Sequence, residues 1–132
     1  MLSVAEINAR IADAPFHRWM GMRAVAVFPS GVNLEIAARD EMLGSNRTGA
    51  LHGGILGALI DATCSYAWIA QTGGYISTVD LRIDFHRPAE TGLLRLEGML
   101  VKNGRRIVIA DARATDAEGK LLVSGRAAMM PA

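Results

Sequence analysis

One long apolar segment constrains the fold of this chain more than any other feature. Residues 53–71 combine small and apolar side chains on every side, with no helix-breaking residue between Gly57 and the pair Gly73-Gly74. A helix that is apolar all round is buried on most of its sides. The segment is borderline for the ~20 residues of a membrane-spanning helix, and it contains Asp61. We therefore expect one long helix inside a soluble domain.

The rest of the sequence is typical of strands. Val79 to Phe85 shows the alternation of apolar and polar residues expected of a half-covered sheet. Turn sequences at 29–31, 102–105 and 116–119 separate the other strand candidates, which span residues 22–28, 32–36, 93–101, 106–115 and 120–130. The expected fold class is α+β, with one long helix inside a mostly antiparallel sheet.

Two segments complete this prediction. Ser3 and Glu6 form a capping-box pattern that begins a short helix, and Pro15 stops it after about three turns. Residues 40–50 are predicted to form a polar loop with two glycines.

Composition narrows the class of protein. The 132 residues, 51% hydrophobic and 20% charged, predict a single domain over residues 1–132 with a proper core. The net charge is +1, and no block of like charge indicates a nucleic-acid or membrane partner. Cys64 is the only cysteine, and no secretion signal is apparent, so we expect a reducing, cytoplasmic location.

Asp61 is the least expected residue of the central helix. An unpaired buried carboxylate is costly, so it must be paired, neutralised or exposed to a wet cleft. A structural carboxylate bonded to Thr63 or Ser65, or one on a narrow exposed stripe, fits the spacing as well as a functional one.

The segment His52-Gly53-Gly54 stands where the long helix begins. Glycines allow close approach to backbone N–H groups, and a helix N-terminus favours developing negative charge, which together suggest an oxyanion hole. A tight loop-to-helix turn is the simpler interpretation. A phosphate loop does not fit, because neither Gly-Lys-Ser/Thr nor GxGxxG is present.

The remaining chemistry-bearing residues favour structural roles. Cys64 lies in an apolar helix and has no histidine in motif relation, so we expect a core residue rather than a nucleophile. His17 and His86 have no metal-ligand spacing, and no metal site is expected. Trp68 and several methionines fit either the core or an acyl pocket.

A longer pattern is more specific than its parts. Asn46-x-x-Gly49-x-x-His52-Gly53-Gly54, followed by Leu59-Ile60-Asp61, resembles the hotdog-fold acyl-CoA thioesterases of the phenylacetate-degradation type. The resemblance also includes residues 78–85, 87–89, 102–105 and 119–125. Altogether it covers the chain from about residue 16 to about residue 126. It implies a hotdog fold, in which an antiparallel sheet wraps around one long helix.

The resemblance also implies catalytic roles. Asp61 would be the catalytic carboxylate, as general base or nucleophile, and Asn46 would hold the water or the thioester. The Gly53 N–H would polarise the thioester carbonyl, with His52 supporting that end of the site. Thr78 would assist the water, although in a regular strand it shares a face with Asp80, away from the helix. No metal or organic cofactor is implied.

The implied substrate is an acyl-CoA thioester with an aryl or a short to medium acyl group. Candidates for binding coenzyme A are the charged and turn residues Arg87, Pro88, Lys102, Asn103 and Arg105, which equally fit solvated turns. A non-catalytic acyl-CoA-binding module or sensor is the alternative, but binding alone needs no base. A hotdog hydratase does not fit, because Tyr66 stands where that branch carries histidine.

Helix geometry predicts a site built from two chains. Asp61 lies eight residues beyond Gly53, or ~12 Å along a helix, whereas a base and an oxyanion donor must act within roughly 6 Å of each other. A second copy related by a two-fold axis would bring its own Asp61 to Gly53. The resemblance implies the same homodimer, usually doubled into a homotetramer.

Overall fold

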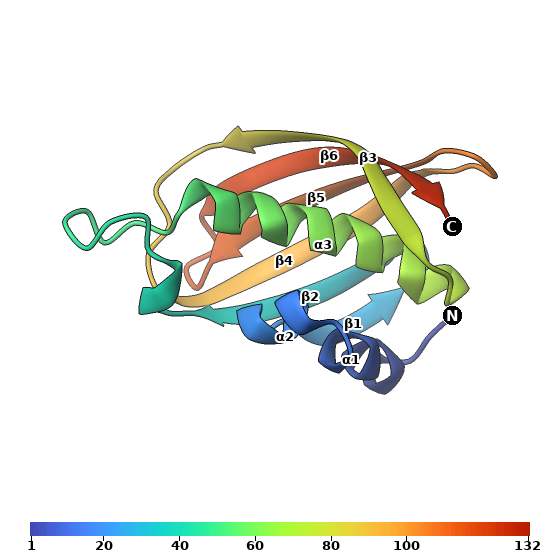
Figure 1. Cartoon of the computed structure of the whole chain (residues 1–132), viewed down its shortest axis with the longest axis horizontal. Helices are drawn as coiled ribbons and strands as arrows, with labels where there is room; N and C mark the ends of the chain where they lie inside the picture. Colours follow the sequence, from blue (N-terminus) through green and yellow to red (C-terminus); the bar gives the residue numbers. More distant parts are fainter.

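The computed structural model describes residues 1–132 and shows a six-stranded antiparallel sheet curved around one long helix (Figure 1). The sheet order is β1-β2-β4-β5-β6-β3, so β1 and β3 are the edge strands. The strands are β1 (Arg23–Phe28), β2 (Gly31–Ala38), β3 (Ile76–Phe85), β4 (Gly92–Asn103), β5 (Val108–Asp116) and β6 (Leu121–Pro131). The predicted α+β hotdog fold is confirmed.

The central helix α3 (Gly53–Thr72) begins and ends within one residue of the prediction. By length and composition it could span a membrane, but ten of its twenty residues are buried against the sheet, as in the core helix of a globular domain. Its remaining partly exposed residues include Ala58, Asp61, Ser65 and Ile69, spaced three or four apart. This spacing forms one open stripe along the helix.

Two glycines let the sheet approach α3 closely. A Cβ atom at Gly98 in β4 would lie 2.7 Å from the carbonyl oxygen of Thr63. A Cβ atom at Gly125 in β6 would lie 2.8 Å from the Cγ2 atom of Ile60. Larger residues at either position would push α3 away from the strands.

The helical content differs from the prediction in two places. Pro15 does not only follow the helix α1 (Val4–Ala12); it also begins a second helix, α2 (Pro15–Met20), which the sequence patterns above do not predict. Proline fits the first position of a helix because the N–H that it lacks would have no partner there. The predicted polar loop contains a short 3-10 helix, η1 (Asp40–Met42). The predicted capping box of α1 is present.

Candidate active site

Asp61 lies near the middle of the open stripe of α3. Its Oδ1 atom accepts a hydrogen bond of 2.6 Å from the Thr78 hydroxyl. Neither of the predicted structural partners bonds Asp61, because Thr63 donates to the carbonyl of Leu59 and the Ser65 hydroxyl contacts the sulfur of Met129, whereas the predicted position on an exposed stripe agrees with the structure. Asp61 is therefore a partly exposed carboxylate whose only side-chain hydrogen bond comes from another element of the fold.

A β-bulge brings Thr78 to Asp61. In the β3–β6 pairing Thr78 opposes Met129 and Asp80 opposes Ala128, so that Val79 is the extra residue. An extra residue shifts the alternation of side chains by one position. Thr78 therefore faces α3 together with Leu81, contrary to the face that a regular strand predicts.

The first turn of α3 combines a cap with a free amide. His52 is the N-cap residue, and its Nδ1 atom accepts a hydrogen bond of 2.8 Å from the Gly54 N–H. The His52 N–H itself donates to the carbonyl of Met42. The Gly53 N–H has no acceptor within the chain, as expected of the first residue of a helix. The segment therefore forms a tight loop-to-helix turn and also leaves one free N–H donor, as an oxyanion hole requires.

Asn46 does not join these residues within one chain. It lies in an exposed loop that projects from the body of the molecule at the end where α3 begins (Figure 1). The loop is held by its own turns, in which the Arg47 and Gly49 N–H groups donate to Ser45. The side chain of Asn46 makes no hydrogen bond with Asp61 or Thr78.

The five candidates for binding coenzyme A are all exposed, and they form two separate groups. Arg87 and Pro88 lie in the β3–β4 connection near the start of α3, where the Leu51 N–H donates to the carbonyl of Ala89. Lys102, Asn103 and Arg105 lie at the β4–β5 hairpin. This hairpin is held to the other end of α3 by a 3.0 Å hydrogen bond from the indole of Trp68 to Asn103.

The structure adds a histidine to the surroundings of Asp61. His17 of α2 is half-buried, and its Nδ1 atom lies 2.8 Å from the hydroxyl of Tyr66 on α3. Burial lowers the pKa of His17, and the negative charge of Asp61 partly opposes this shift. Burial also raises the pKa of Tyr66 to about 12. No local pattern could reveal this pair, because its members lie 49 residues apart.

Cys64 is chemically inert in this structure. It is fully buried, and burial raises the pKa of its thiol to about 12, so the thiolate that would act as a nucleophile is not formed at neutral pH. No three His, Cys, Asp or Glu side chains are close enough together to hold a metal ion.

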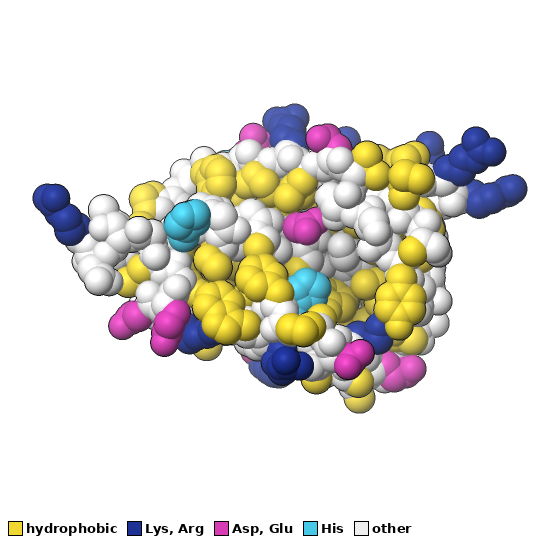
Figure 2. Space-filling model, in the orientation of Figure 1, with side chains coloured by type: hydrophobic (Ala, Val, Ile, Leu, Met, Phe, Trp, Pro, Cys, Tyr) yellow, Lys and Arg dark blue, Asp and Glu magenta, His cyan; other side chains and the backbone are white.

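The face that carries Asp61 is largely hydrophobic. Figure 2 shows hydrophobic side chains gathered over α2, α3 and β3, with an acidic side chain and a histidine among them. Phe16 and Trp19 of α2 stack with ring centroids 6.0 Å apart, although each is about half exposed. On β3, Val79 and Phe85 are more than half exposed. Such a patch on one face indicates an interaction surface.

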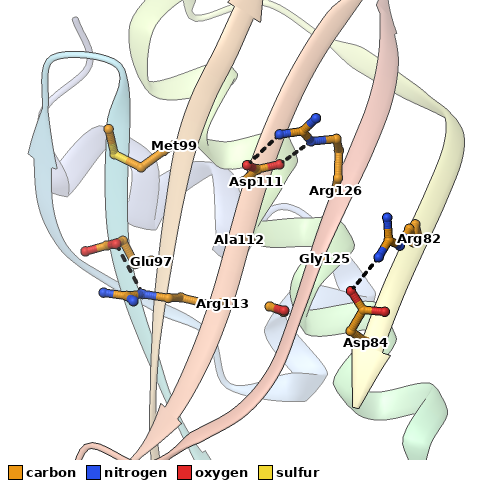
Figure 3. A pocket seen from close by; sticks show the side chains of 10 residues that line it. Arg82, Asp84, Glu97, Met99, Asp111, Ala112, Arg113, Gly125 and Arg126 are labelled. Atoms are coloured by element: carbon orange, nitrogen blue, oxygen red, sulfur yellow. Dashed lines mark hydrogen bonds and ion pairs between the residues drawn. The ribbon is translucent and has the colours of Figure 1, made fainter. Parts of the chain in front are cut away.

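The opposite face of the sheet is a charged surface. It holds a concavity of about 470 Å³ whose acids and arginines are paired with one another (Figure 3). The pairs are Arg126–Asp111 at 2.6 Å, Arg82–Asp84 at 3.2 Å and Arg113–Glu97 at 3.4 Å. The pairs are exposed and already neutralised, and Asp61 is on the other side of the sheet, so this concavity is not the candidate active site.

Comparison with known proteins decides the family. The sequence profile described as "Thioesterase superfamily" matches residues 48–123, which is more than half of the chain.

The chain belongs to the thioesterase superfamily.

Individual relatives agree with this assignment. Human acyl-coenzyme A thioesterase 13 is 29% identical over 91% of this chain and 87% of that protein. A solved structure of a thioesterase-superfamily protein is 38% identical, with a TM-score of 0.89 over 96% of each chain. A thioesterase structure from Ralstonia eutropha, described as phenylacetic acid degradation-related, is 28% identical, with a TM-score of 0.81 over 89% of each chain. The protein is a thioesterase, and its resemblance to phenylacetate-degradation enzymes is confirmed.

The matched segment contains most of the candidate site. His52, Gly53, Asp61 and Thr78 all lie within residues 48–123, whereas Asn46 precedes the segment by two residues. The structure adds one direct contact among the candidates, from Thr78 to Asp61.

Proposed function

We propose that this thioesterase hydrolyses acyl-CoA thioesters, with an aryl or a short to medium acyl group, to the free acid and coenzyme A. The observation that carries the proposal is the partly exposed Asp61, oriented by Thr78, on a helix that begins with a free amide at Gly53. The names of the human and Ralstonia eutropha relatives support the acyl-CoA class and an aryl acyl group, respectively.

Asp61 acts in this proposal as the base, or as the nucleophile itself. As a base, it takes a proton from water while the water oxygen attacks the thioester carbonyl. The C–S bond then breaks, and the proton passes to the departing coenzyme A thiolate. Thr78 occupies Oδ1 of Asp61, which leaves Oδ2 available for the water. The Gly53 N–H stabilises the carbonyl oxygen as its negative charge develops.

Two chains build each site in this proposal. Asp61 is ~12 Å along α3 from Gly53 of the same chain, too far for both to act on one carbonyl. Edge strand β3, with its exposed Val79 and Phe85, offers a second copy an unpaired strand and apolar surface next to Thr78. A homodimer across this edge would place the partner's Asp61 at Gly53.

The same two-fold axis would unite the candidates for binding coenzyme A. In such a dimer the two α3 helices run antiparallel, and Asp61 of one chain lies beside Gly53 of the other chain. Trp68, seven residues past Asp61 on the same helix, then lies ~10 Å beyond the N-terminus of the other helix. Trp68 holds the hairpin of Lys102 and Asn103, which would then lie near Arg87 and Pro88 of the other chain. We further propose a cytoplasmic homotetramer, made of two such dimers, in which residues 1–132 form one domain.

The first experiment measures turnover and its dependence on Asp61. Thiol release from a panel of aryl, short and long acyl-CoAs should show hydrolysis by the wild-type protein. The variant Asp61→Asn should lose about 10²–10⁴-fold in kcat and keep Kd within about tenfold, because the amide retains the size of the carboxylate but not its basicity. Binding of acyl-CoA without thiol release by the wild-type protein would favour the non-catalytic alternative.

The second experiment tests the shared site by complementation. Gly53→Pro and Asp61→Asn chains, each inactive alone, are mixed and allowed to exchange subunits. In the mixed dimer one site carries both changes and the other carries neither, so about half of the wild-type activity should return. Verified mixed dimers that remain inactive would contradict the two-chain site.

A further inference from the structure

Gly57 is a glycine inside α3 that the packing of the single chain does not require. A Cβ atom at this position would have one near neighbour, Cγ1 of Ile83, at an ordinary contact distance of 3.9 Å. At Gly98 and Gly125, by contrast, an added Cβ atom would come within 3.0 Å of atoms in neighbouring elements. Alanine is more favourable than glycine in the interior of a helix. The reason for a glycine at residue 57 therefore lies outside the single chain.

The proposed two-chain site places Gly57 on the two-fold axis. Gly53, Gly57 and Asp61 are spaced four residues apart, so they lie along one row on the surface of α3. If Asp61 of each chain acts at Gly53 of the other, the axis passes beside the residue halfway between them. That residue is Gly57, ~6 Å along the helix from each. It is partly exposed, as Asp61 is.

The charges on edge strand β3 agree with an axis at this position. Ile83, the neighbour of Gly57, is a β3 residue. In an antiparallel pairing of two copies centred on Ile83, Arg82 of each chain lies opposite Asp84 of the other. Opposite charges at such positions stabilise a pair of strands. A pairing centred on Arg82 would place this arginine opposite itself. Figure 3 shows both side chains on the same face of the sheet.

We propose, building on the proposed two-chain site, that Gly57 is a positioning residue. It lies on the dimer axis, where the absence of a side chain lets the two α3 helices approach closely enough for each Asp61 to act at the partner's Gly53. For helices packed about 8–10 Å apart, Cα atoms that face each other on the axis are about 3.5–5.5 Å apart. Any side chain at this position occurs twice at the same point and separates the helices.

The first experiment locates the axis by cross-linking. Two copies of Gly57→Cys would have a Cα separation close to the ~4.4–6.8 Å of a disulfide, so oxidation by copper-phenanthroline should link most of the dimer covalently. Ser65→Cys, on the same open stripe, is the matched control. Its two copies would lie ~24 Å apart along the helices and should not be linked. The wild-type protein should stay unlinked, because Cys64 is buried. Non-reducing gels measure the linked fraction.

The second experiment measures the effect of positioning on turnover. Gly57→Ala fits the single chain and favours the helix, so the variant should stay folded, with a Tm within about 5 °C of the wild type. Its kcat should fall by about tenfold, because a displacement of about 1 Å at the reacting groups can cost 10²-fold. The larger Gly57→Val should lose more. Wild-type kcat in both variants would contradict the positioning role.

Failure of this inference is separable from failure of the proposed function. Cross-linking requires no turnover, so a covalent Gly57→Cys dimer supports the position of the axis even if no acyl-CoA is hydrolysed. Active dimers in which Gly57→Cys does not cross-link, or in which Ser65→Cys cross-links equally well, would overturn the inference and leave the hydrolysis standing. A monomeric wild-type protein, measured by light scattering, would overturn both the inference and the two-chain site.

Discussion

The two ends of α3 differ in how fully the rest of the chain hydrogen-bonds their backbone groups. At the C-terminal end, Gly73 adopts a left-handed conformation with φ 71°, and Arg10 donates to the carbonyls of Gly73 and Gly74 at 3.0 and 2.8 Å. The Leu2 N–H also donates to the carbonyl of Ala70. At the N-terminal end the only side-chain cap is His52, and the Gly53 N–H remains free.

The difference indicates that the C-terminal end of α3 contributes to stability and that its N-terminal end contributes to the chemistry. Every helix has unpaired N–H groups at its start and unpaired carbonyls at its end. Here α1 and the N-terminal segment donate to the carbonyls of Ala70, Gly73 and Gly74, whereas the Gly53 N–H is left available to a ligand. Changes at the Gly53 end should therefore alter activity, and changes at the Gly73 end should alter stability.

The largest effect is expected at Gly53. Gly53→Pro removes the amide hydrogen but suits the first position of a helix, and His52 already has the extended conformation (φ −60°, ψ 133°) that precedes proline. We expect kcat to fall by about 10²–10³-fold, with little change in the melting temperature.

Gly53→Ala is the matched control. It retains the N–H, and its Cβ atom would meet the ring of Phe85 at an ordinary contact distance of 3.5 Å. Its kcat should stay within about threefold of the wild type. Equal losses in the two variants would show that the side-chain space, and not the amide, matters at this position.

The opposite end gives the largest expected effect on stability. Arg10→Gln removes two charge-assisted hydrogen bonds and the stacking of the guanidinium on Tyr75. We expect a loss of about 1.5–3 kcal/mol in the free energy of unfolding, and a fall of roughly 5–10 °C in Tm. The kcat of the folded variant should remain that of the wild type. A fall in the kcat of Arg10→Gln without a loss of stability would contradict the assignment of stability to this end of α3 and of activity to the other.

His52 tests whether the cap at the catalytic end is only structural. His52→Ala should cost about 1 kcal/mol, measured by urea unfolding, because the Gly54 N–H loses its acceptor. His52→Asn provides another good cap and should restore the stability. If both variants lose activity while His52→Asn remains as stable as the wild type, His52 also orients the substrate.

The smallest expected effect is on the pH dependence of stability, and it comes from His17, which packs beside the middle of α3. The pKa of His17 is lowered by burial from its usual value of 6.5, so the unfolded chain binds a proton more readily than the folded one. The stability that His17 contributes is present above pH 6.5 and is lost as the pH falls through its folded pKa.

Urea unfolding of the wild type and of His17→Phe, at about pH 7.5 and about pH 5.5, measures this contribution. The difference between the two free energies should shift against the wild type at the lower pH. A difference that does not change with pH would mean that the surroundings of His17 do not distinguish its two protonation states.

Local patterns determined much of this protein. The apolar run of residues 53–71 predicts α3 almost to its ends, and the alternation from Val79 to Phe85 predicts a half-covered strand. The spacing from Asn46 to Asp61 indicates the family, because its residues lie close together in the sequence, in one short loop and in the first half of one helix. Such features depend on neighbours within a few residues, so the sequence alone contains them.

The tertiary structure decided the contacts between distant segments. The bulge at Val79 turns Thr78 toward Asp61, although strict alternation along β3 predicts the opposite face. His17 meets Tyr66 only because α2, which begins at Pro15, packs beside α3. A single extra residue in a strand, or a side chain that crosses between two helices, depends on packing across the fold and leaves no periodic signal in the sequence.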